Sequence, residues 1–187
     1  QWLADIDADS ASALRGTMER APLLRPLLAS IMEASPYLFD LIRIHPQRLI
    51  AALGCDPDSR VDHLIAQCRA QMDRESDQAG AMTRLRHLKA EASLLISLCD
   101  LADVWDVMTI TRALTRLADA SVQCALHFLL RQEEARGRYV PRDADDPAIG
   151  CGLIILAMGK MGAGELNFSS DIDLIVFFDA ARVQLAD

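Results

Sequence analysis

The pattern of apolar positions from Ser10 to about Gly137 predicts helices almost throughout. Apolar residues recur at three- and four-residue spacing and β-branched runs are few, which is typical of amphipathic helices. The clearest segment runs from Met108 to Arg136 and is long enough for seven or eight turns. Its expected packing stripe consists of Ile110, Leu114, Leu117, Ser121, Ala125 and Leu129.

Local signals predict where several of these helices begin or end. Ser35 precedes Pro36, and a hydroxyl residue followed by proline is typical of a helix N-terminus. The dipeptide His45-Pro46 either ends that helix or begins the next one. Two further helices are predicted, one from Val61 to about Gln78 and one from Met82 through Leu98.

The character of the sequence changes after Gly137. Residues 137–151 contain two prolines, two glycines and several aspartates, a composition typical of a polar connection. Two short β-rich runs follow, Leu153–Met158 and Ile172–Phe178, and both predict strands. Because the run after Asp173 is apolar on both faces, we expect that strand to be buried on both sides.

The predicted fold class is therefore α+β, with a helical region in residues 1–140 and the start of a sheet domain in residues 141–187. Two strands do not make a stable sheet by themselves. We therefore expect the 187 residues to be a fragment of a larger protein.

Composition narrows the class of protein. With 51% hydrophobic and 25% charged residues the chain has the make-up of a soluble globular protein. Its apolar runs are shorter than the roughly 20 residues of a membrane span, and no secretion signal opens it, so we expect a cytoplasmic protein without membrane contact. A net charge of -8 argues against nucleic acid as a partner, because phosphate binding needs clustered cations.

Charged clusters and cysteines are given structural interpretations. The most basic cluster, Arg84, Arg86, His87 and Lys89, is interpreted as a solvated helix face, because acids flank it. The acidic stretch 143–146 is interpreted as a solvated linker rather than a docking site for a basic partner. The five cysteines form no C-x-x-C pair, which indicates buried thiols rather than disulfides or zinc ligands.

Candidate chemistry is concentrated near the end of the chain. Asp171 and Asp173 are spaced i, i+2, so in a strand both carboxylates point to one side and can share a divalent cation. Oxygen ligands favour Mg²⁺ or Mn²⁺. An ionised aspartate beside a buried strand is costly without such compensation, which is the physical reason to suspect function.

The preceding loop has the residues of a phosphate site. Its glycines allow close approach of the backbone to a phosphate, and its serines add hydroxyl donors; the candidate binding residues are Gly159, Lys160, Gly162, Gly164, Ser169 and Ser170. The glycine order is not that of a dinucleotide-binding loop, and Met161 replaces the Ser or Thr of a Walker A loop. The structural alternative is a tight strand connection with two solvated acids.

Residues 159–175, Gly-Lys-Met-Gly-Ala-Gly-Glu-Leu-Asn-Phe-Ser-Ser-Asp-Ile-Asp-Leu-Ile, resemble the nucleotidyltransferase motif of the glutamine synthetase adenylyltransferase family. Members of that family add AMP to glutamine synthetase and remove it. Weaker similarity extends through residues 35–49 and 85–89. The family's full-length protein has two such modules, and residues 165–173 are more similar to the N-terminal, deadenylylating one.

The resemblance implies a polymerase-β-like sheet and removal of AMP by phosphorolysis, with glutamine synthetase as substrate and ADP as product. It implies metal ligation by Asp171 and Asp173, and phosphate binding by Gly162 with its neighbours and by Ser170, with Lys160 adding positive charge. It also implies a nitrogen-regulatory PII protein as partner. Adenylylation from ATP is the alternative reaction, and a non-catalytic helical interaction module is the alternative class.

Three departures from the family pattern limit what the resemblance implies. Ala163 stands where members often have a second adjacent glycine, and whether Gly159 or Gly162 faces the phosphate is open. The superfamily also needs a third carboxylate from a later strand, and Asp179 and Asp187 lie too close in sequence to supply it. We therefore expect these 187 residues alone to be inactive or nearly so.

Overall fold

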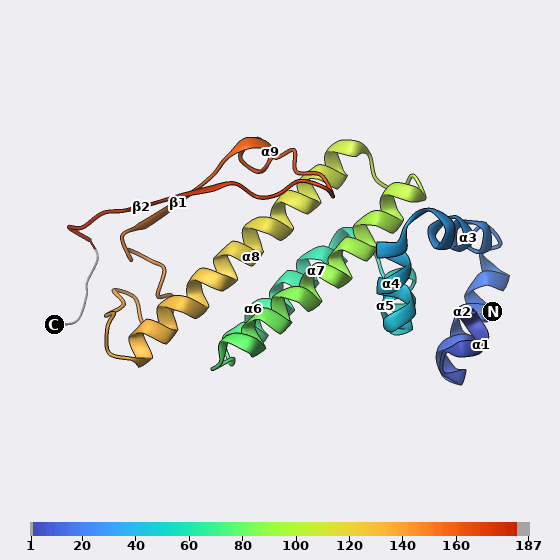
Figure 1. The fold of residues 1–187 in the computed structure, drawn as a ribbon, viewed down its shortest axis with the longest axis horizontal. Coiled ribbons are helices and arrows are strands. Elements are labelled where there is room, and N and C mark those ends of the chain that lie inside the picture. The colour runs from blue at the N-terminus through green and yellow to red at the C-terminus, as the bar shows by residue number, and fades with distance from the viewer. Residues whose placement is uncertain (1, 183–187) are drawn as a thin grey trace.

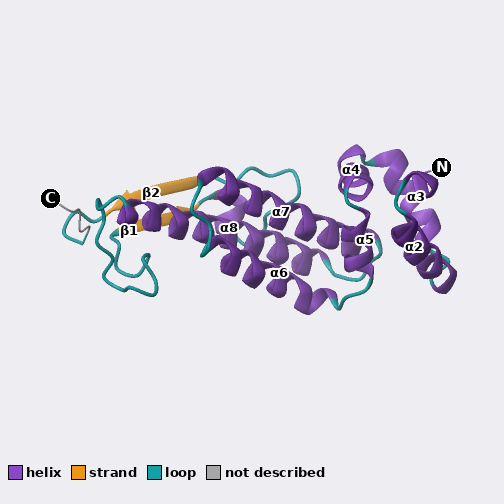
Figure 2. Ribbon diagram, turned by 90° about the horizontal axis from the view of Figure 1, so that it is seen from below, coloured by secondary structure: helices purple, strands orange, loops and turns teal. Residues whose placement is uncertain are grey.

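A computed structural model describes residues 2–182 of the chain. The helices are α1 (Trp2–Asp5), α2 (Ala8–Arg20), α3 (Leu24–Ala34), α4 (Pro36–Ile44), α5 (Pro46–Leu53), α6 (Pro57–Met72), α7 (Gln78–Leu101), α8 (Val107–Ala135) and α9 (Gly159–Gly162), and the strands are β1 (Leu153–Ala157) and β2 (Leu174–Phe178). The long helices α6, α7 and α8 pack side by side, and α1 to α5 gather at one end of the molecule (Figures 1 and 2). The strand pair runs along α8 (Figure 1). This arrangement confirms the α+β class.

Capping residues determine the boundary between α4 and α5. The Ser35 hydroxyl accepts a hydrogen bond from the Leu38 N–H at 3.3 Å, and Pro36 is the first helical residue, as predicted. At the other end of α4, His45 leaves the helical conformation and Pro46 begins α5. The dipeptide His45-Pro46 therefore ends α4 and also begins α5, the two alternatives that the sequence left open.

Two predicted helix boundaries were wrong by several residues. The helix predicted to reach about Gln78 ends at Met72. Asp77 instead caps the following helix, because its carboxylate accepts hydrogen bonds from the N–H groups of Ala79 and Gly80 at 2.8 and 3.2 Å. That helix, α7, consequently begins four residues before the predicted Met82.

Helix α7 belongs to two hydrophobic cores. Leu94, which is 0% exposed, packs with the residues of α1 to α5. Ile96, also 0% exposed, packs with α6 and α8 on the other side of α7. The two cores share this helix, so α7 connects the short N-terminal helices to the long helical pair.

The packing stripe of α8 was predicted correctly only at its N-terminal end. Ile110, Leu114 and Leu117 are buried as expected, but Leu129 is 55% exposed. The buried stripe continues through Ala120, Cys124 and Phe128 instead. Successive turns of an α-helix drift around its axis, so over eight turns the residues that face a neighbour change.

Helix α8 begins at a capping aspartate whose ionisation should affect acid stability. The Asp106 carboxylate accepts a hydrogen bond from the Thr109 N–H at 2.7 Å, and this bond lowers the pKa of Asp106 below its usual value. A carboxyl group with a depressed pKa in the folded state stabilises the fold above its unfolded pKa of about 3.9, and loses that contribution as pH falls through the folded pKa.

Asp106→Asn is therefore expected to give a shallower loss of stability between about pH 5 and pH 2.5, because asparagine still caps the helix but does not titrate. Urea unfolding midpoints measured across this range test the prediction. Asp119→Asn, at an exposed position within α8, is the matched control and should follow the wild-type curve. Identical curves for all three proteins would contradict it.

The cysteines confirm the prediction of packed thiols. All five are free; four are buried and Cys55 is half-buried. Burial raises the pKa of the Cys99 thiol to about 11. Separately, none of the helices in residues 2–182 is both long enough and apolar enough to cross a bilayer.

The strand pair is antiparallel, and its burial differs from the prediction. Leu153 pairs with Phe178, and Ala157 with Leu174. The expectation that β2 is buried on both sides was wrong, because all five of its residues are exposed, with Phe178 at 71%. Within residues 2–182, β1 is the only strand beside β2, so the apolar faces of β2 have too few neighbours to cover them.

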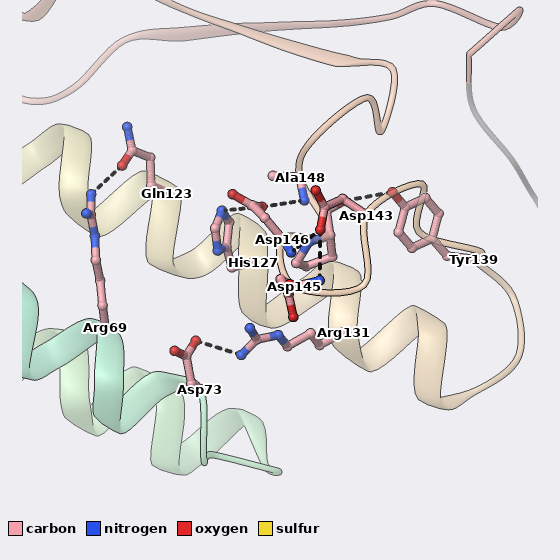
Figure 3. Close-up of polar contacts among 11 residues, drawn as sticks. Arg69, Asp73, Gln123, His127, Arg131, Tyr139, Asp143, Asp145, Asp146 and Ala148 are labelled. Atoms are coloured by element: carbon pink, nitrogen blue, oxygen red, sulfur yellow. Dashed lines mark hydrogen bonds and ion pairs between the residues drawn. The ribbon is translucent and has the colours of Figure 1, made fainter.

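The connection between α8 and β1 is folded against α8 (Figure 3). The Asp143 carboxylate accepts hydrogen bonds from the N–H groups of Asp145 and Asp146 at 2.9 and 3.2 Å. Asp146 lies 3.3 Å from Nε2 of His127 on α8. The stretch is accessible to solvent, as expected of a solvated linker, and two of its aspartates also hold the turn in place.

The division into a helical region 1–140 and a sheet region 141–187 stays a prediction. The structure shows helix up to Ala135 and strand from Leu153. It also shows the buried side chains of Met161 and Leu166 within the core formed by α6, α7 and α8. The segment that contains the candidate site is thus packed onto the helices.

Candidate metal and phosphate site

The paired acids lie just before β2. The predicted strand began at Ile172, whereas β2 begins at Leu174, so Asp171 and Asp173 precede it. The Asp173 carbonyl nevertheless accepts a hydrogen bond from the Met158 N–H at 2.9 Å. This bond lies just beyond the last strand pair, Ala157 with Leu174, and ties the backbone of Asp173 to the end of β1.

The predicted glycine-rich loop contains one turn of helix, α9, between Met158 and Ala163. Its first residue, Gly159, has a φ of +54°, which favours glycine. A carbon at the Cβ position of Gly159 would lie 3.7 Å from Oδ2 of Asp173. The backbone of Gly159 and the carboxylate of Asp173 are thus close neighbours, and Gly159 is the loop glycine on the side of the acids.

Glycine is needed at position 162 for a different reason, which is the close approach of α9 to β1. A carbon at the Cβ position of Gly162 would lie 2.4 Å from the carbonyl oxygen of Ala157, the last residue of β1. Only glycine allows α9 to approach the strand this closely. The next residue, Ala163, has a φ of -81°, which any residue adopts, so alanine in place of a second glycine causes no strain here.

The other loop candidates are exposed or have a positive φ. Lys160 is on α9 and its side chain is exposed; it forms no ion pair within residues 2–182. Gly164 follows α9 with a φ of +75°. The roles of Lys160, Gly162 and Gly164 in phosphate binding stay predictions.

Asn167 organises the two serines, and sequence reasoning missed it. Its Oδ1 accepts hydrogen bonds from the Ser170 hydroxyl at 2.7 Å and from the Ser169 N–H at 3.2 Å. The signal was present in the sequence, because an asparagine that hydrogen-bonds to residues two and three positions on is typical of a turn. In this arrangement the Ser170 hydroxyl proton is already donated, so towards a phosphate it has only lone pairs to offer.

Contacts with α8 fix the position of this loop. The Leu166 N–H donates a hydrogen bond to Oγ1 of Thr115 at 3.3 Å, and the Thr115 hydroxyl in turn donates to the Thr111 carbonyl at 2.9 Å. Leu166 is 6% exposed. The residues that lead to the paired acids are therefore anchored on the longest helix of the molecule.

The donor set at the paired acids fits Mg²⁺ or Mn²⁺. Both carboxylates are exposed, and neither forms an ion pair or side-chain hydrogen bond with residues 2–182, so their oxygens are accessible to a cation. Magnesium is usually held by one or two carboxylates, with substrate phosphates and water as the other ligands. No group of three or more His, Cys, Asp or Glu side chains in the described part of the chain is arranged to hold a metal.

A cleft of about 840 Å³ opens beside Asp171, a volume within the usual range for small-molecule sites. One wall is the loop from Leu166 to Ile172, which includes Ser169, Ser170 and Asp171. The opposite walls come from α7, from α8 and from the start of α4. The structure therefore places three of the predicted site residues, Ser169, Ser170 and Asp171, in one cleft. Asp173 is not among the residues that line it, and lies beside Gly159.

Sequence reasoning did not predict the α7 wall of this cleft: it interpreted Arg86 and Lys89 as part of a solvated helix face, and both are indeed exposed. Arg86, Lys89, Ser93, Ser97 and Asp100 all line the cleft. They follow one another at intervals of three or four residues, which places them on one face of a helix. The apolar positions between Met82 and Leu98 predicted only the face of this helix that packs against other helices.

Comparison with known proteins shows the family to which this sequence belongs. Residues 26–186 match the family model described as glutamate-ammonia ligase adenylyltransferase. Among similar curated proteins are the bifunctional glutamine synthetase adenylyltransferase/adenylyl-removing enzymes of Rhodopseudomonas palustris strain BisB5, 54% identical over 99% of this chain, and of Bradyrhizobium diazoefficiens, 53% identical over 99%. The enzyme of Xanthobacter autotrophicus is 46% identical over 94% of the chain.

The matched region covers 19%, 18% and 18% of these three relatives, so the chain spans about a fifth of their length. The match with the family model nevertheless covers most of the chain, including the glycine loop and the paired acids. The chain therefore belongs to the glutamate-ammonia ligase adenylyltransferase family.

Proposed function

We propose that this chain supplies part of the active site of an enzyme that removes AMP from adenylylated glutamine synthetase by phosphorolysis. The observation that carries the proposal is the placement of two exposed carboxylates that form no ion pair among the described residues: Asp171 lines a cleft large enough for a nucleotide, and Asp173 lies beside Gly159. The names of the relatives support glutamine synthetase as the protein substrate. A nitrogen-regulatory PII protein is proposed as the effector.

In the proposed reaction, an oxygen of inorganic phosphate attacks the phosphorus of the AMP–tyrosine bond. The bond between phosphorus and the tyrosine oxygen breaks, that oxygen takes up a proton, and the new phosphorus–oxygen–phosphorus link gives ADP. Bound Mg²⁺ or Mn²⁺ would neutralise charge on the transferring group. Asp171 and Asp173 would hold the metal, and the Gly159 backbone would allow the phosphate close to them.

The exposed apolar faces of β1 and β2 support a larger sheet. Ile154, Leu156, Val176 and Phe177 are each between 45% and 58% exposed, and exposed apolar surface of this kind is typical of an interface. We propose that further strands of a polymerase-β-like sheet cover it and bring the third carboxylate.

The alternative reaction is adenylylation of glutamine synthetase from ATP, and the relatives' names include both activities. A polypeptide of the relatives' full length that carries these residues should be assayed for both reactions. Phosphorolysis is followed as ADP released from adenylylated enzyme, phosphate and Mg²⁺. Adenylylation is followed as pyrophosphate released from ATP and unmodified enzyme.

We expect the Asp171→Asn, Asp173→Asn double variant to lose ADP release and to keep pyrophosphate release. The opposite pattern would assign adenylylation to this module. If the variant keeps both activities and binds glutamine synthetase normally, the module is an interaction module without catalytic function.

A further inference from the structure

Helix α7 presents a polar stripe to the cleft that its packing does not explain. Most of α7 from Ala92 to Cys99 is buried among apolar side chains, yet Ser93 and Ser97, each 6% exposed, line the cleft. Serine hydroxyls can both donate and accept hydrogen bonds. The stripe therefore gives the cleft one polar wall, formed by α7.

The two cations at the start of the stripe lack acidic partners. Arg86 and Lys89 form no ion pair within residues 2–182, although other cations of this region do. Arg84 lies 3.6 Å from Glu75, and Arg60 lies 3.5 Å from Glu91 on α7. In a protein with a net charge of -8, two neighbouring unpaired cations in a cleft form a local positive site.

The acids of the cleft do not cancel this positive charge. Asp100 is eleven residues beyond Lys89 on α7, which is roughly 16 Å along the helix axis at 1.5 Å per residue. Asp171 is on the facing loop and belongs to the proposed metal pair. Arginine and lysine together suit a phosphate group, because arginine offers a planar fork of donors and lysine a mobile point charge.

We propose that Arg86 and Lys89 bind a phosphate group of the substrates in this cleft, which Asp171 also lines. This inference rests on the proposed function and deepens it. Two carboxylates alone would repel a phosphate, so a cationic wall across the cleft offsets the repulsion and holds the phosphate oxygens towards the metal. The phosphate is either the attacking inorganic phosphate or the phosphate of the adenylyl group, and both present the same oxyanion.

The test uses a polypeptide of the relatives' full length that carries these residues, with Arg86→Gln, Lys89→Gln and the double variant. Arg84→Gln is the matched control, because Arg84 is on the same helix and carries the same charge but does not line the cleft. Arg86→Lys and Lys89→Arg test rescue by charge. The measurements are KM and kcat for phosphorolysis with inorganic phosphate, and binding of ADP by calorimetry with and without Mg²⁺.

We expect the double variant to raise the KM for phosphate or the dissociation constant of ADP about tenfold to a hundredfold, the usual effect of losing charge-assisted hydrogen bonds. The charge-conserving variants should recover most of the affinity, and Arg84→Gln should stay within about twofold of wild type. A rise confined to the KM for phosphate identifies the attacking phosphate as the ligand. A rise confined to the KM for adenylylated glutamine synthetase identifies the adenylyl phosphate.

Unchanged kinetics and unchanged ADP binding in the double variant would overturn the inference, as would an equal loss in Arg84→Gln. The binding experiment separates this inference from the proposed function. If the wild-type protein releases no ADP but the double variant loses ADP binding, the proposed reaction is wrong and the phosphate site stands. If the wild-type protein catalyses phosphorolysis and the double variant matches it, the reaction stands and the phosphate site is wrong.

Discussion

Replacing either Asp171 or Asp173 by asparagine is expected to lower the rate of phosphorolysis at least about a thousandfold. Asparagine keeps the shape of the side chain but removes the negative charge that holds the cation. Charge stabilisation by a catalytic metal contributes several kcal/mol, and a loss of about 4 kcal/mol corresponds to a factor of roughly 10³ in rate. Both carboxylates are exposed and unpaired among the described residues, so neither substitution should unfold the chain.

The measurements are single-turnover release of ADP and direct binding of Mn²⁺ followed by electron paramagnetic resonance. Asp119→Asn is the matched control, because Asp119 is an exposed acid on α8 that does not line the cleft. It makes the same change in net charge and should keep both activity and Mn²⁺ affinity. Retention of turnover and of Mn²⁺ binding by the Asp171 and Asp173 variants would contradict the assignment of these residues as metal ligands.

The parts of the fold that the sequence predicted well depend on local interactions. The start of α4 follows from the Ser35 hydroxyl and Pro36, which act on groups within three residues. The start of α7 has an equally local signal, because the Asp77 carboxylate caps it. Apolar periodicity does not show this boundary, since a cap is a single polar residue outside the apolar pattern.

The burial of β2 could not be predicted in the same way, because it depends on which elements cover the strand. The apolar sequence of Ile172–Phe178 is typical of a buried strand, yet β2 has one neighbouring strand within residues 2–182 and stays exposed. A strand's sequence shows what its faces can pack against. It does not show where the covering elements lie.

The candidate site could likewise be predicted only where its signal is local in the sequence. Asp171 and Gly159 were predicted as site residues because their signal is a contiguous motif. The cleft was not found, because Arg86 on α7 and Ser170 on the loop are more than eighty residues apart and the fold alone brings them to one cleft. In the sequence, Arg86 and Lys89 have the spacing of any solvated helix face, and only the facing loop distinguishes them.

Gly162→Ala is expected to destabilise the site and lower activity together. The added methyl carbon would lie 2.4 Å from the Ala157 carbonyl oxygen, and since that atom is backbone, either α9 or the end of β1 must move. Overpacking of this kind typically costs about 1–3 kcal/mol. The movement would also disturb the hydrogen bond from Met158 N–H to the Asp173 carbonyl, and hence the position of one proposed metal ligand.

Gly16→Ala on α2 is the matched control, because it makes the same substitution within a helix. Its added carbon would lie 3.5 Å from the Arg20 guanidinium, an ordinary contact, so alanine's better helix propensity should raise stability by about 0.5–1 kcal/mol. Urea unfolding and Mn²⁺ binding measured on both variants separate the two effects. Equal stability and unchanged Mn²⁺ affinity in Gly162→Ala would show that α9 can shift freely, and that its close approach to β1 does not position the paired acids.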